Sequence, residues 1–136
     1  TPLLKTVIAG IVGMPAASKF FAVINQKHLP SAKEILLGDF AKQKTALKKC
    51  ITPELAAVNE SIFRFIETKG YEEKDAAKVA KNFAAYFEFL SGEKFREAQA
   101  HFVSQYSSSL YPSTMSFVIM QCPELYRKIM AFVKSI

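Results

Sequence analysis

The sequence contains few of the residues that end strands and build tight turns. Only 5 Gly and 6 Pro occur among 136 residues, which is too few for a β-sandwich with its many turns. Apolar residues recur at steps of three and four instead of alternating, so no segment favours a strand. No apolar run approaches the roughly 18 residues of a membrane-spanning helix. We therefore expect an all-α fold without a membrane span.

Residues that commonly catalyse reactions or bind metals are scarce. His28 and His101 are the two histidines, and neither forms a metal-binding pattern with a second histidine or a cysteine. The sequence has no phosphate-binding glycine loop and no nucleophile motif of the hydrolases. His28 falls in an expected turn, and His101 lies beside an apolar helix face. We therefore expect no enzymatic activity, no metal site and no cofactor.

Arginine is scarce as well, with 3 Arg against 15 Lys in a chain of net charge +6. Sites that bind nucleic acids favour arginine, because its planar group matches phosphate and guanine edges. We therefore expect no nucleic-acid partner. A solvated face explains the lysines between residues 33 and 49, and a transient contact with an anionic membrane surface or an acidic head group is the alternative. These lysines are Lys33, Lys42, Lys44, Lys48 and Lys49.

The two cysteines, Cys50 and Cys122, each lie shortly before a proline at an expected helix junction. An even pair in a small chain that starts at Thr1 without Met favours one disulfide and a secreted, extracellular protein. Two buried free thiols are the alternative. A disulfide would close a loop of about 72 residues and contribute about 4 kcal/mol of stability. Asn59 begins a glycosylation pattern, Asn-Glu-Ser, inside a predicted helix.

Helix start and stop signals divide the chain into about seven to eight short to medium helices within a single domain, residues 1–136. A capping box begins at Ser31, Pro53 opens the next helix, and Gly70 is expected to end it. The helices expected at 72–90 and 113–122 are apolar on most sides, the first over roughly 240° of its circumference. We therefore place these two at the centre of the bundle. The predicted helices are 2–12, 15–27, 31–49, 52–69, 72–90, 93–107, 113–122 and 123–134.

Aromatic and flexible apolar side chains are abundant, with 12 Phe and 4 Met. Flat rings and methionines suit a helical cavity that admits an alkyl chain, although a filled Phe-rich core gives the same composition. Our first hypothesis is a secreted carrier that buries the tail of a fatty acid or retinoid between helices 52–69, 72–90 and 113–122, with a lysine pairing with the head group. The predicted lining is Ile62, Phe65, Phe83, Phe87, Met115 and Val118.

The alternative function is a secreted interaction or effector protein with a filled core. It would act through contacts with a protein partner or as a homodimer. A third interpretation is a membrane-active protein that uses the apolar first helix and the basic surface.

Overall fold

The computed structural model describes residues 29–135, and within this range the chain forms seven α-helices, two short 3-10 helices and no strand. The all-α prediction is confirmed for this part, and the helices expected at 2–12 and 15–27 lie outside it. The α-helices are α3 (Ala32–Leu37), α4 (Phe40–Leu47), α5 (Thr52–Glu67), α6 (Ala76–Leu90), α7 (Arg96–Ser107), α8 (Pro112–Gln121) and α9 (Pro123–Ser135), and the 3-10 helices are η1 (Glu73–Asp75) and η2 (Glu93–Phe95).

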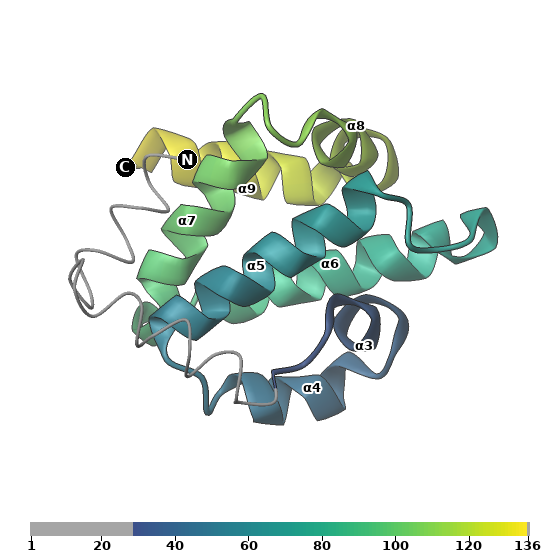
Figure 1. Cartoon of the computed structure of the whole chain (residues 1–136). Coiled ribbons are helices and arrows are strands. Elements are labelled where there is room, and N and C mark those ends of the chain that lie inside the picture. The colour runs from purple at the N-terminus through teal and green to yellow at the C-terminus, as the bar shows by residue number, and fades with distance from the viewer. Residues whose placement is uncertain (1–28, 136) are drawn as a thin grey trace.

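Helices α5 and α6 run side by side through the middle of the described part (Figure 1). Helix α3 packs against both α5 and α6, and α4 lies beside α3. Helix α8 covers another part of the α5–α6 pair, and α9 packs against α8. Helix α7 crosses at one end and contacts α5 and α6. The central position expected for 72–90 is thus confirmed, but that expected for 113–122 is wrong, because only Thr114, Phe117 and Val118 of α8 are buried.

The single helix predicted for 31–49 is divided at Gly38 into α3 and α4. The Gly38 N–H donates to the Glu34 carbonyl, 3.1 Å away, and a Cβ at residue 38 would lie 2.4 Å from that oxygen. Only glycine fits this approach. Asp39 then caps α4 by accepting a hydrogen bond of 3.1 Å from the Ala41 N–H. The Gly-Asp pair therefore ends one helix and starts another.

A cluster of aromatic rings fills the centre of the bundle. The Phe102 ring of α7 lies 4.8 Å from the Phe63 ring and 5.2 Å from the rings of Phe83 and Phe87, measured between centroids. The rings of Phe63, Phe83 and Phe102 are completely buried. Tilted contacts at these distances are favourable beyond the burial of area. The cluster ties α5, α6 and α7 together.

The predicted disulfide between Cys50 and Cys122 is wrong, because the two cysteines are not near each other. Both do lie at helix junctions, as expected. Cys50 follows α4, whereas Cys122 follows α8, and these helices lie on opposite sides of the α5–α6 pair (Figure 1). The Cys50 thiol instead donates to the Ala46 carbonyl, at 3.6 Å. Burial raises the pKa of the Cys122 thiol to about 11.

Candidate functional site

The carboxyl end of α5 has an unusual backbone that places a lysine at the surface. The N–H of Gly70 donates to the Phe65 carbonyl at 2.9 Å, and the N–H of Lys69 donates to the Ile66 carbonyl at 3.1 Å. These two bonds form a Schellman motif, in which glycine usually takes the left-handed position. Here Lys69 takes it, with φ of 52°. Gly70 is needed one residue later, because a Cβ there would lie 2.6 Å from the Phe65 ring.

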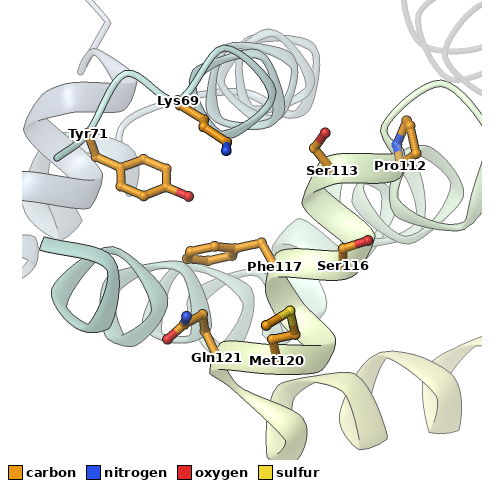
Figure 2. A pocket seen from close by; sticks show the side chains of 8 residues that line it. All are labelled: Lys69, Tyr71, Pro112, Ser113, Ser116, Phe117, Met120 and Gln121. Carbon is orange, nitrogen blue, oxygen red and sulfur yellow. The ribbon is translucent and has the colours of Figure 1, made fainter. Parts of the chain in front are cut away.

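Lys69 borders a groove between the end of α5 and one face of α8 (Figure 2). Its amine is directed into the groove, and the aromatic ring of Phe117 lies across the floor. The groove has a volume of about 380 Å³, within the range of small-molecule sites. The α8 wall consists of side chains spaced three or four residues apart, which share a helix face. The lining is Lys69, Tyr71, Pro112, Ser113, Ser116, Phe117, Met120 and Gln121.

The groove continues past Phe117 into a second hollow of about 330 Å³. The two share Lys69, Tyr71, Phe117 and Gln121, and Glu73 and Ala76 complete the second. Together they form an elongated surface depression whose middle is aromatic.

The aromatic residues in the middle of the groove pack against one another and against the hydrophobic core. The Tyr71 ring meets Phe117 edge to face, with 5.7 Å between the centroids, and lies 6.2 Å from the Phe65 ring. Burial raises the pKa of the Tyr71 hydroxyl, so Tyr71 stays protonated and can donate a hydrogen bond at neutral pH. Met120 is 78 % exposed at the edge. The walls can therefore contact apolar groups, and the Lys69 amine, Tyr71 hydroxyl and serines can contact polar ones.

Glu67 fixes α8 in place beside Lys69. Helix α8 has no capping side chain of its own, and the Glu67 carboxylate takes that role from α5. It accepts hydrogen bonds from the N–H groups of Ser113, at 3.3 Å, and Thr114. The Thr114 hydroxyl also donates to it, at 2.6 Å. A carboxylate at a helix N-terminus is favourable.

Because Glu67 is engaged with the N-terminus of α8, it does not pair with the Lys69 amine, which lies in the groove as a positive charge. Within residues 29–135, no carboxylate forms an ion pair with the Lys69 amine. An acidic group on a bound molecule would supply one.

The six predicted lining residues do not share this groove. Ile62, Phe83, Phe87 and Val118 are buried in the core, and Phe65 and Met115 are half-buried. Phe65 and Phe87 border two separate surface hollows. An internal lining by these six residues stays a prediction. Sequence reasoning did not identify Lys69, Tyr71, Phe117 or Met120 as site residues, although Lys69-Gly70 was visible as a helix end.

A buried polar network also lies between α5, α6 and α7. The Asn59 side chain donates to the Ala98 carbonyl at 2.8 Å and accepts from the Tyr86 hydroxyl. Its amide nitrogen therefore faces His101 Nδ1, 3.3 Å away, and this ring nitrogen must accept. The other ring nitrogen, Nε2, lies 3.2 Å from the side-chain nitrogen of Gln105.

Because this network is buried and uncharged, we assign it a role in the stability of the fold. Desolvation lowers the pKa of His101 from 6.5 to about 4, so the ring is neutral at pH 7. Asn59 and His101 are completely buried. The amide of the Asn-Glu-Ser pattern is thus engaged inside the fold, where no glycan fits.

No cluster of three metal-ligating side chains occurs in the described residues. None of the helices from α3 to α9 is long and apolar enough to cross a bilayer. Comparisons with protein-family models, curated proteins and solved structures find no match to this chain.

Proposed function

We propose that the protein binds a small amphipathic molecule with an apolar body and an acidic head, such as a fatty acid or an acidic retinoid. The binding site is the groove between the end of α5 and α8. The observation that carries this proposal is the Lys69 amine, directed into a groove that has an aromatic floor and lacking a carboxylate partner among residues 29–135.

The head group would pair with Lys69, with Tyr71 and the serines of α8 within the same groove as donors. The apolar body would lie along Phe117 towards Met120. Burying eight methylenes contributes about 6 kcal/mol before the costs of association. Binding in a surface groove agrees with the closely packed rings of the core. Secretion stays a prediction, and it is no longer supported by the cysteines, because Cys50 and Cys122 form no disulfide with each other.

A titration with a fluorescent fatty acid tests the proposal, using Lys69→Gln as the variant and Lys74→Gln as the control. Lys74 is an exposed neighbour that pairs with Glu72 outside the groove. We expect saturable one-to-one binding that Lys69→Gln weakens by about 10- to 150-fold, since a hydrogen bond to a charged group contributes about 1.5–3 kcal/mol. The control should bind like the original chain.

The alcohol of the same chain length separates head-group pairing from apolar contact. Its affinity should be the same with and without Lys69→Gln. Absence of saturable binding, or equal losses for acid and alcohol, would overturn the assignment of Lys69 to the head group.

A protein-interaction function is the second candidate, because apolar side chains are exposed around α8. Met120, Leu110 and Ile119 are 78 %, 58 % and 47 % exposed. Methionine and aromatic side chains are enriched at protein interfaces. Sedimentation at increasing concentration tests for a homodimer. Association that Met120→Asp abolishes, without fatty-acid binding, would favour this function.

A further inference from the structure

Helix α4 presents a lysine-rich face that is exposed and makes little contact with the other helices described between residues 29 and 135. Only Leu47 of its eight residues is fully buried. At 100° per residue, four lysines lie within an arc of about 160° around the helix, and this arc begins about 60° from Leu47. All four are exposed: Lys42, Lys44, Lys48 and Lys49.

No acidic residue neutralises this face. Helix α4 contains no Asp or Glu, and the preceding Asp39 is engaged as its N-cap. Within the described range, none of the ion pairs involves these four lysines. The face therefore carries four positive charges over little more than two helical turns.

Helix stability explains only part of this arrangement. Lys48 and Lys49 lie at the carboxyl end of α4, where positive charge interacts favourably with the helix dipole. Lys42 lies in the first turn, where the same interaction is unfavourable. Its presence there suggests that the face as a whole serves contact with an anion.

An exposed apolar side chain lies two residues after Lys49 in the sequence. Ile51 follows α4 and is 58 % exposed, and its N–H is fixed by a 2.8 Å hydrogen bond to Glu54. Ala41 and Ala46 are also exposed on α4. A basic face together with an exposed apolar side chain is the combination found on proteins that lie at membrane surfaces.

We propose that α4 and Ile51 form a docking surface for membranes that contain acidic phospholipids. The lysines contact the head groups, and Ile51 enters the boundary between head groups and acyl chains. A nucleic acid fits less well, because the face has no arginine and no aromatic side chain for stacking on bases. This surface is distinct from the Lys69 groove.

Sedimentation of the full chain with vesicles tests this proposal. We compare phosphatidylcholine vesicles with vesicles in which roughly one third of the lipid is phosphatidylserine, a composition that gives a negative surface potential. Binding is expected only to the acidic vesicles, and high salt should abolish it. Removing three lysines, with Lys44→Gln, Lys48→Gln and Lys49→Gln combined, should weaken binding by about 100-fold.

Two matched controls distinguish binding by this surface from an effect of net charge and from nonspecific binding through any exposed apolar side chain. Lys74→Gln, Lys94→Gln and Lys134→Gln combined change the net charge equally but leave α4 intact, so binding should be kept. Ile51→Ser should weaken binding several-fold, whereas Leu110→Ser, at a side chain of equal exposure, should not. Circular dichroism checks that all variants fold.

Equal losses for the two triple variants would overturn the proposal, because net charge alone would then explain binding. Equal affinity for acidic vesicles and for a DNA duplex, with Ile51→Ser unchanged on both, would also overturn it and indicate a general polyanion surface. Binding to acidic vesicles that persists in Lys69→Gln would show that it is independent of the groove.

Discussion

Lys69 has an energetically unfavourable backbone conformation, and its side chain lies in the groove. A non-glycine residue in the left-handed region costs roughly 1–2 kcal/mol, and φ of Lys69 is 52°. Such outliers persist where surrounding structure or function requires them.

Replacing Lys69 with glycine should separate stability from binding. Lys69→Gly removes the backbone cost, so we expect the free energy of unfolding to rise by about 1 kcal/mol. The same change removes the cation, so fatty-acid binding should weaken. Denaturant unfolding and the fluorescent titration measure the two effects. A variant that is more stable and binds unchanged would contradict the role of Lys69.

The buried His101 should make stability depend on pH. Its pKa in the fold is about 4, below the ordinary 6.5, so the unfolded chain takes up a proton at a pH where the folded chain does not. Stability from this group is complete above pH 6.5 and is lost as the pH falls towards 4, by about 3 kcal/mol. Unfolding curves between these pH values measure the loss.

His101→Gln is the control for that pH series, because glutamine does not titrate. The slope of stability against pH in the original chain should exceed that of the variant. Equal slopes in the two chains would mean that folding does not lower the pKa of His101.

At the scale of elements, Glu67 connects α5 to α8. Glu67→Ala leaves the first N–H groups of α8 without their acceptor, so we expect a loss of about 1–2 kcal/mol. Amide exchange at Ser113 and Thr114 should become faster. Glu73→Ala is the matched control, since Glu73 is exposed and makes no such cap; its effect should stay within about 0.5 kcal/mol.

Most helices could be predicted from local signals, and the exceptions have physical reasons. Pro53 and Pro123 begin helices close to the expected positions. The sequence does not reveal the break at Gly38, because a glycine inside an apolar periodic run can be tolerated, and only the close approach to Glu34 shows that it ends α3. Apolar residues all round α8 suggested a central helix, but Ile119 and Met120 face outwards. Periodicity does not distinguish a buried face from an exposed apolar one.

At the scale of the whole molecule, the two cysteines provide the next test. After denaturation without reductant, both thiols should react with an alkylating reagent, and reductant should not change the melting temperature. In the folded protein Cys122 should react slowly, because its pKa of about 11 leaves little thiolate. Mass spectrometry counts the modified thiols. Labelling that appears only after reduction would contradict the absence of a disulfide between Cys50 and Cys122.

The groove could not be predicted from the sequence, because its parts come from distant positions. The Lys69 wall and the α8 wall are more than 40 residues apart in the chain, and packing of α8 on α5 and α6 brings them together. Sequence composition suggested an apolar ligand but placed it among Phe83, Phe87 and their neighbours, whose rings pack against Phe102. Composition alone cannot tell surplus rings from rings that fill the interior.

One consequence follows from the way Glu67 joins the two sides of the groove. A molecule that contacts both Lys69 and α8 adds a second link between α5 and α8, beside the Glu67 carboxylate. Among the described helices, α9 packs mainly against α8. Occupancy should therefore slow the detachment of residues 112–135 from the rest of the fold, and by thermodynamic reciprocity anything that loosens this segment should release the guest.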